Sequence, residues 1–370
     1  MKSRLFGFAL AILGCADAFA QIEVPKAADN APIDAATRKR VLNALEENVS
    51  EIYIFPDMAR KVVLSLKQHE AKADYDKLTT AGEFATQVTR DMQAVAHDKH
   101  LGLSSVGPMK DPGSLTSAER ESVQQTMRED LRAKNYDFHE VKRLPGNIGY
   151  LELRSFQNVN SGAGDIAAAA MTFLSNCDAV IFDLRNNRGG GPQMIDLLIS
   201  YLYPLGQRVH LNDFLRRDKS VEQFWTSSWV PGKTLAGKDI YVLTSNRTFS
   251  AAEEFAYDIQ ALKRGTIVGE ITRGGGNAGG MVHLGDNFAA FIPSQAARNP
   301  ITKSNWDGVG VKPDVQVSAD DALKAASLLA LRKLASNDAP PALQRERRDA
   351  LADLEKQVSE KVPPTKSASD

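Results

Sequence analysis

From residue 147 to residue 270, short runs of apolar and β-branched residues alternate with alanine- or leucine-rich helical patterns. The extended runs are NIGYLELRSF, DAVIFDLR, DIYVLTS and GTIVGE, and the helical patterns between them are AGDIAAAAMTFLSN, PQMIDLLISYLY and AAEEFAYDIQAL. This alternation predicts an α/β fold, in which a mostly parallel sheet is covered by helices. Reacting groups collect at the carboxyl ends of the strands in such sheets, so the loops that follow the strands are where a site is expected.

The chain of 370 residues is long enough for one large domain and a smaller one. Residues 35–97 contain three patterns with apolar residues three and four positions apart, which predict a small N-terminal three-helix domain. The remaining parts are a signal peptide over 1–20, a linker over 21–34, the α/β core over 98–336, and a charged helix with a disordered tail over 337–370. The charged helix could cap the core, pair with a second subunit in a homo-oligomer, or stay solvated.

The first twenty residues have the pattern of a secretory signal peptide. Lys2 and Arg4 precede a short apolar run, and small residues then flank Phe19 before Gln21, which predicts cleavage after Ala20. The sequence ILGC also allows a lipoprotein reading with Cys15 as the lipidated residue, and a retained anchor is the third alternative. We therefore expect an exported protein, periplasmic or secreted, with no transmembrane segment in its mature chain.

Composition argues against several classes of partner and cofactor. The 45 basic and 46 acidic residues nearly cancel, so nothing indicates a nucleic-acid partner. Two cysteines are too few for a thiolate metal cluster, and the six histidines do not form the H-E-x-x-H pattern of a catalytic zinc site. The glycine-rich loop RNNRGGGPQM lacks the spacing of a nucleotide-binding loop. We expect neither a cofactor nor a metal.

Ser250 lies where the run DIYVLTS gives way to the helical pattern AAEEFAYDI. It has two possible roles. With Glu253 it forms S-x-x-E, the capping box that satisfies free N–H groups at a helix start. A serine at a strand-to-helix turn can also act as a nucleophile, because backbone N–H groups beside it can stabilise an oxyanion. This stretch alone leaves both roles open.

The loop after the run DAVIFDLR is the second candidate part of a site. Its three adjacent glycines allow close approach of an extended chain, and Gly189 or Gly190 could donate to an oxyanion together with Ala251. A glycine turn for tight strand–helix packing is the alternative. His100, which opens the stretch HLGL, is a candidate base, although a lone histidine is more often structural. Asp307, in NWDGVG, is either the carboxylate that orients it or part of an ordinary Asp-Gly turn.

Six motifs together resemble the C-terminal processing peptidase superfamily, which includes the tail-specific proteases, the tricorn core and the interphotoreceptor retinoid-binding modules. They are DKHLGL, GNIGYLELRSF, VIFDLRNNRGGGPQM, LTSNRTFSAAEEFAY, GEITRGGG and NWDGVGVKPDV, and the resemblance covers roughly residues 35 to 335. The resemblance implies a spiral α/β core of the crotonase and Clp-protease kind, with Ser250 as nucleophile.

Two branches of this superfamily differ in the base. The processing peptidases carry a lysine about twenty-five residues after the serine, where this chain has RGGG at 273–276. The tricorn-like and retinoid-binding-like branch uses a histidine in D-G-H-L and a carboxylate in W-E-G, which here correspond to His100 and Asp307. Lys99 replaces the glycine, Asp307 replaces the glutamate, and the spacing leaves no room for a PDZ domain. The resemblance therefore implies the second branch.

These observations predict an exported serine peptidase that acts on peptides or unstructured protein tails. In this reading Ser250 attacks the carbonyl, His100 transfers the proton and Asp307 orients the imidazolium. The alternative is a non-catalytic module that binds apolar ligands, as the retinoid-binding relatives imply. The presence of all three residues favours the enzyme.

Overall fold

The computed structural model describes residues 29–108 and 114–361. The predicted signal peptide, Cys15, most of the predicted linker and the tail from residue 362 lie outside these residues. Among the described residues, no helix combines the length and the apolar character needed to cross a bilayer.

A six-stranded sheet forms the centre of the core, in the order β11-β8-β7-β4-β3-β2. Its five strands from β3 to β11 run parallel, and β2 pairs antiparallel with β3 at one edge. This sheet confirms the predicted α/β class. Its strands are β2 (Phe138–Leu144), β3 (Ile148–Leu153), β4 (Ala179–Asp183), β7 (Asp239–Thr244), β8 (Thr266–Gly269) and β11 (Val315–Gln316).

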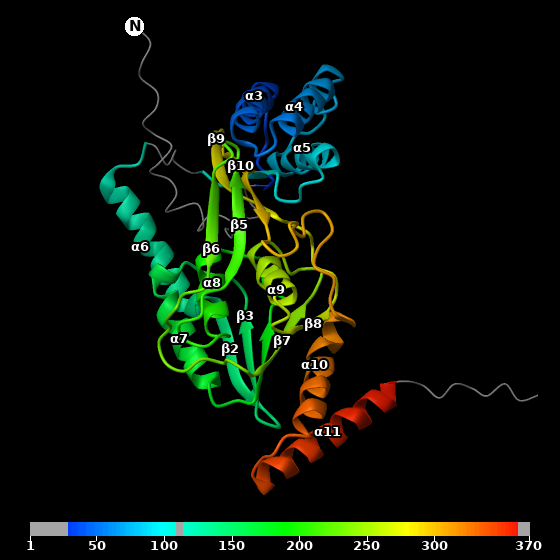
Figure 1. The fold of residues 1–370 in the computed structure, drawn as a ribbon. Helices are drawn as coiled ribbons and strands as arrows, with labels where there is room; N and C mark the ends of the chain where they lie inside the picture. Colours follow the sequence, from blue (N-terminus) through cyan, green and yellow to red (C-terminus); the bar gives the residue numbers. More distant parts are fainter. Residues whose placement is uncertain (1–28, 109–113, 362–370) are drawn as a thin grey trace, which may run out of the picture.

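Helices bury both faces of this sheet, which explains why its strands are apolar without alternation. Along β4, Val180 and Phe182 point into the core formed with α7 (Ala163–Leu174), α8 (Pro192–Ser200) and α9 (Ala251–Ala261). Ala179 and Ile181 point to the opposite face, which is covered by α10 (Ala319–Leu334). Figure 1 shows α10 on the side of the sheet away from α7 and α8.

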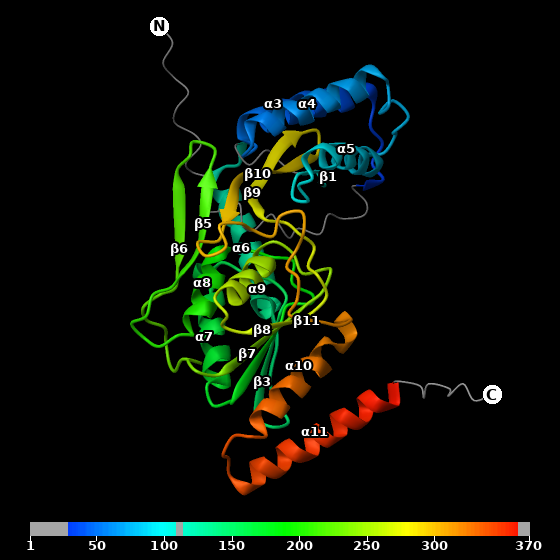
Figure 2. The ribbon, with the colours of Figure 1, turned by 45° about the vertical axis from the view of Figure 1, so that its right-hand side comes forward.

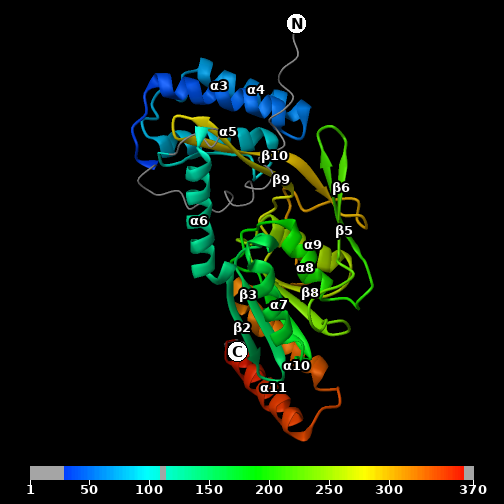
Figure 3. The same ribbon diagram turned by 90° about the vertical axis from the view of Figure 1, so that its left-hand side faces the viewer.

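A second, five-stranded sheet lies between the core and the N-terminal helices (Figures 1 and 3). Its order is β1-β10-β5-β6, with β9 also paired to β10. The strands are β1 (Gly102–Ser105), β5 (His210–Arg216), β6 (Val221–Trp225), β9 (Asn277–Gly285) and β10 (Phe288–Arg298). Strands β5 and β6 form a hairpin, and Arg217 in its turn donates to the carbonyls of Ser50 and Tyr53 at the end of α3, at 2.7 and 3.2 Å.

The N-terminal helices share one apolar core with the second sheet. They are α3 (Ala35–Ile52), α4 (Pro56–Ala71) and α5 (Ala81–Ala96). Buried residues of these helices, such as Val41 and Phe84, pack against Leu103 of β1 and against Phe288 and Ile292 of β10. The predicted boundary at residues 97 and 98 falls between α5 and β1, and the apolar core continues across it.

The helix α6 (Ser117–Ala133) has no buried residue and runs along one side between the N-terminal helices and the core (Figure 3). A capping box of Thr116 and Glu119 closes its first turn. Two short 3₁₀ helices complete the described elements, η2 (Asn135–Asp137) and η3 (Val159–Ser161).

The charged helix α11 (Pro341–Lys361) packs against α10 at the end of the core (Figure 2). This arrangement selects capping over the solvated state that the sequence also allowed. Arg347 is buried and donates to the carbonyls of Gly146 and Leu334, at 3.3 and 3.0 Å, and to the Asp178 carboxylate at 2.6 Å. A single buried guanidinium thus ties the helix to the β2–β3 turn and to the end of α10.

We predict that Arg347→Ala lowers the free energy of unfolding by about 1 to 3 kcal/mol, because three acceptors lose a charged donor. Urea denaturation measures the change. The neighbouring exposed Arg348 provides the control, and Arg348→Ala should stay within about 0.5 kcal/mol of the wild type. Equal losses in the two variants would contradict the role of Arg347 in holding α11.

Candidate active site

Ser250 occupies a sharp turn between β7 and α9. Its backbone has φ 57° and ψ −124°, which places a non-glycine residue in a sparsely populated region. Such a conformation persists only where the surroundings hold it, and it is a common feature of functional sites. The turn presents the serine side chain at the carboxyl end of a central strand, as a nucleophile elbow does.

The capping box at this turn forms through its glutamate. The Ser250 N–H donates to Oε2 of Glu253 at 2.8 Å. The N–H groups of Glu253 and Glu254 donate to the backbone carbonyl of Ser250, at 2.8 and 3.0 Å, so the start of α9 does not depend on the serine hydroxyl. Because the backbone satisfies the helix start, the hydroxyl is left available for another role.

The Glu253 carboxylate also holds the loop that contains RGGG. It is fully buried and accepts from the Thr272 hydroxyl and the N–H of Gly274, each at 2.5 Å, and from the N–H of Gly275 at 2.8 Å. Burial raises the pKa of Glu253, while these hydrogen bonds act in the opposite direction. One carboxylate thus fixes the Ser250 turn relative to the 272–275 loop.

The glycine loop after β4 lies directly against Ser250. A Cβ added to Gly189, which has φ 113°, would come within 2.7 Å of the Ser250 Cβ, so only glycine fits there. The Gly189 N–H donates to Oδ1 of Asn187 at 2.8 Å, which makes it a poor oxyanion donor, contrary to one of the sequence-based alternatives. Within the described chain, the N–H groups of Gly190 and Ala251 have no acceptor and remain available.

The imidazole of His100 lies between two phenyl rings next to the nucleophile turn. Its centroid is 4.4 Å from that of Phe249, the residue before Ser250, and 5.3 Å from that of Phe291. Burial, together with the nearby Arg273 guanidinium, lowers the pKa of His100 to about 4. The ring is therefore neutral near pH 7, as a general base must be.

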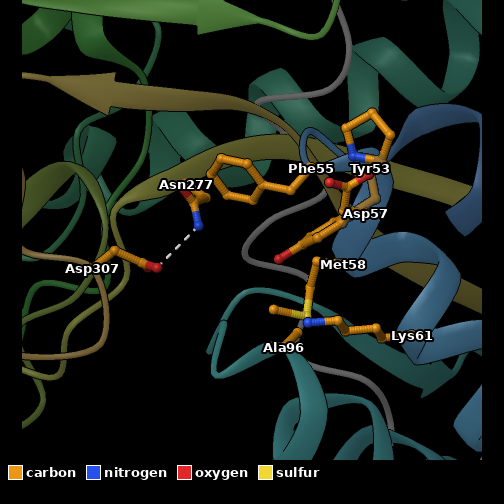
Figure 4. Close-up of a pocket in the computed structure, with 9 residues that line it drawn as sticks. Tyr53, Phe55, Asp57, Met58, Lys61, Ala96, Asn277 and Asp307 are labelled. Carbon is orange, nitrogen blue, oxygen red and sulfur yellow. Dashed lines mark hydrogen bonds between the residues drawn. The ribbon is translucent and has the colours of Figure 1, made fainter.

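Among the described residues, Asp307 makes no hydrogen bond to Nδ1 of His100, although the sequence-based expectation was that it orients this ring. Its carboxylate accepts from the N–H of Gly276 at 2.9 Å and from Nδ2 of Asn277 at 3.0 Å (Figure 4). Nδ1 of His100 is buried and has no partner in the described chain. Asp307 stands where the tricorn-like branch is expected to carry a longer glutamate, and its hydrogen bonds go to Gly276 and Asn277. Burial is the main cause that raises the pKa of Asp307 to about 6.

A cavity of about 400 Å³ opens beside Asp307, between the core and the N-terminal helices (Figure 4). Asp307 and Asn277 form one wall in the close-up, and residues of the α3–α4 region form the other. The lining residues are Tyr53, Phe55, Pro56, Asp57, Met58, Lys61, Ala96, Asn277 and Asp307. The candidate acid thus borders a cavity that the sequence did not indicate.

Gly275 lies twenty-five positions after Ser250, where the processing peptidases are expected to carry their lysine. A Cβ there would come within 2.3 Å of the Phe249 ring and within 2.7 Å of Cε1 of His100. The Gly275 carbonyl is held by the Trp306 indole N–H at 2.7 Å, so the backbone has little freedom to retreat. A side chain at position 275 is therefore incompatible with the present positions of the Phe249 and His100 rings.

Sequence reasoning missed several residues that shape the site. Asn277 lies outside the six motifs, and Phe249 lies within one of them but had no role assigned to it. The link from Glu253 to the 272–275 loop lies beyond its capping-box signature. Asp98 could have been noticed, because it stands two positions before His100 and its Oδ1 accepts the His100 N–H at 3.0 Å. No group of three histidine, cysteine or acidic side chains suited to a metal ion occurs among the described residues.

Comparisons with known proteins agree with the resemblance seen in the motifs. Residues 147–317 match the profile of peptidase family S41. Residues 35–137 match the N-terminal domain of this family in eukaryotic IRBP.

Two sequence relatives are processing proteases. The carboxy-terminal-processing protease of Bartonella bacilliformis is 27% identical over 188 residues, 47% of this chain and 40% of the relative. The chloroplastic C-terminal processing peptidase of Tetradesmus obliquus is 27% identical over 206 residues, 53% of this chain and 40% of the relative. The matched part thus spans less than half the length of either relative.

Solved structures support the fold. Mature CPAF has a TM-score of 0.55 at 12% identity, over 88% of this chain and 98% of CPAF. A lipoprotein from Streptococcus agalactiae has a TM-score of 0.52 at 14% identity, over 80% of this chain and 96% of that protein.

We predict that Gly275→Ala displaces the adjoining rings of Phe249 and His100, since the added methyl group overlaps both, at a cost of about 1 to 3 kcal/mol in stability. The displaced imidazole gains solvent, so its pKa should rise from about 4 toward the ordinary value near 6.5. NMR titration of the imidazole signals measures this shift. Gly107→Ala is the control, because a methyl group there meets no atom within 4 Å. An unchanged His100 titration in Gly275→Ala would contradict the described packing.

Proposed function

The chain belongs to peptidase family S41, and we propose that it is a serine-type peptidase that uses Ser250, His100 and Asp307 to hydrolyse peptides or unstructured protein tails. The observation that carries the proposal is the Ser250 turn, where a strained serine has a hydroxyl not committed to the cap and lies beside N–H groups without acceptors. A residue that served only as a cap would gain nothing from φ 57°.

The proposed reaction begins when Oγ of Ser250 attacks the scissile carbonyl carbon and its proton passes to Nε2 of His100. Nε2 is the favoured ring nitrogen, because Nδ1 is buried. The carbonyl oxygen becomes an oxyanion that accepts from the N–H groups of Ala251 and Gly190. His100 then protonates the leaving amine as the C–N bond breaks, which leaves the acyl-enzyme. In the second half of the reaction His100 takes a proton from water, the water oxygen attacks the ester carbonyl, and the proton returns to Oγ of Ser250 as the acid product leaves.

The acid of the relay is proposed to be Asp307, which would stabilise the imidazolium that forms during each proton transfer. Each carboxylate oxygen can accept two hydrogen bonds, so the bonds from Gly276 and Asn277 leave room for an N–H of the imidazole. Catalytic hydrogen bonds often shorten only when substrate binds. An extended substrate would add to a sheet edge beside the 185–194 loop.

Export is the second part of the proposal, and it rests on the signal-like sequence of residues 1–20. We predict that the intact mass of the protein recovered outside the cytoplasm corresponds to a chain that begins at Gln21. A mass that corresponds to a diacylated Cys15 would instead identify a lipoprotein. A mass that includes Met1 would contradict cleavage altogether.

We predict that Ser250→Asn is folded and inactive. The backbone carbonyl of Ser250 already accepts from the N–H groups of Glu253 and Glu254, at 2.8 and 3.0 Å, so the start of α9 does not depend on the serine hydroxyl and the melting temperature should stay within a few degrees of the wild type. Asparagine cannot form the acyl-enzyme, so turnover should fall by about a millionfold. Peptide hydrolysis and fluorophosphonate labelling measure the loss.

Ser228→Asn is the control for this substitution, because Ser228 is exposed on a loop and should keep full labelling. Turnover near the wild-type value in Ser250→Asn would mean that Ser250 is only a cap. A wild-type protein that neither hydrolyses peptides nor reacts with fluorophosphonate would favour the non-catalytic binding module.

A further inference from the structure

We propose that Asn277 is a positioning residue, whose side-chain amide joins the carboxylates of Asp98 and Asp307 and so fixes the acid relative to the loop that carries His100. This inference rests on the peptidase function proposed above. It concerns a residue that touches neither the nucleophile nor the base in the described contacts.

The Asn277 amide uses both of its hydrogens on carboxylates. Nδ2 donates to Oδ2 of Asp98 at 2.9 Å and to Oδ2 of Asp307 at 3.0 Å, the second bond being drawn in Figure 4. Asn277 is 2% exposed and Asp98 is 0% exposed, so water does not compete for either group. An amide nitrogen has two hydrogens, and no other neutral side chain of this size offers two donors from one atom.

Asp98 extends the link to the histidine loop and to the N-terminal helices. Its Oδ1 accepts a hydrogen bond from the backbone N–H of His100 at 3.0 Å, and its Oδ2 accepts one from the Tyr53 hydroxyl at 3.0 Å. Tyr53 follows the end of α3. Asn277 therefore connects three segments that are distant in the sequence, and the relay acid and the proposed base lie on two of them.

The amide also separates two carboxylates that would otherwise repel each other. Burial and the Asp98 charge raise the pKa of Asp307, whereas the donors from Gly276 and Asn277 and the charge of Lys99 lower it. Tyr53 faces the same pair as a neutral hydroxyl. Asp57 and Lys61, which carry opposite charges, line the wall of the cavity that faces Asp307 (Figure 4). Loss of the amide removes a hydrogen bond that lowers the pKa of Asp307, while the repulsion from Asp98 that raises this pKa remains.

Two substitutions test the role of Asn277. Asn277→Leu keeps the volume and removes both donors, and Asn277→Asp keeps the shape and adds a third carboxylate. We predict that kcat falls by about 10- to 100-fold with KM near the wild-type value, the range typical when a supporting hydrogen bond is removed. The acidic limb of kcat should move to higher pH, further in Asn277→Asp, because Asp307 must then be deprotonated against stronger repulsion.

Asn299→Leu is the matched control. Asn299 is also buried, and its Nδ2 donates to a buried carboxylate, Asp258, at 3.0 Å. This variant should lose stability to a similar degree and keep the wild-type pH profile. A wild-type profile in Asn277→Leu, or the same shift in Asn299→Leu, would overturn the proposal.

Carboxyl ¹³C NMR titration of Asp307 separates this proposal from the proposed function, because it does not require turnover. A higher midpoint in Asn277→Leu than in the wild type supports the positioning role even in a protein without peptidase activity. An unchanged midpoint would overturn it even in an active peptidase. Asn277→Asp serves as the second variant if Asn277→Leu does not fold.

Discussion

The buried carboxylate of Glu253 is the contact on which the arrangement of the site depends. It accepts four hydrogen bonds, from the N–H groups of Ser250, Gly274 and Gly275 and from the Thr272 hydroxyl. An ionised acceptor bound by several donors forms some of the strongest hydrogen bonds in a protein. The strained Ser250 turn and the glycine loop facing His100 are therefore two parts of one rigid unit, and neither can move without breaking bonds to the same side chain.

His100 belongs to a different part of the chain from the Ser250 turn and the 272–275 loop. It precedes β1, whose apolar residues belong to the core shared by the N-terminal helices and the second sheet. Polar contacts then cross between the two parts: Lys99 donates to the Arg273 carbonyl, and Asp98 accepts from Asn277. The site therefore lies where the N-terminal part meets the parallel sheet, and its geometry depends on how these two parts pack.

The sequence was sufficient for features that depend on local pattern. The parallel sheet was predictable because strands such as β4 are buried on both faces and therefore read as continuous apolar runs. The position of Ser250 at a strand-to-helix turn was predictable because a strand pattern changes to a helix pattern beside it. The contacts of Asp307 were not predictable, because Asn277 is thirty positions away in the sequence and carries no motif. The sequence allowed the Gly189 N–H as an oxyanion donor, but in the fold this N–H donates to the Asn187 side chain. In each case tertiary packing, which a local pattern does not encode, decided the partner.

The steric conflict at Gly275 limits how such a site can change its base over time. A lysine at this position would overlap the rings of Phe249 and His100, since even a Cβ there comes within 2.3 Å of the first and 2.7 Å of the second. With this backbone, a lysine at position 275 is therefore incompatible with the proposed base His100 in its present position. A lysine there would require the 272–275 loop to be rebuilt or both rings to move. The loop that Glu253 holds thus restricts which basic side chain the proposed site can contain.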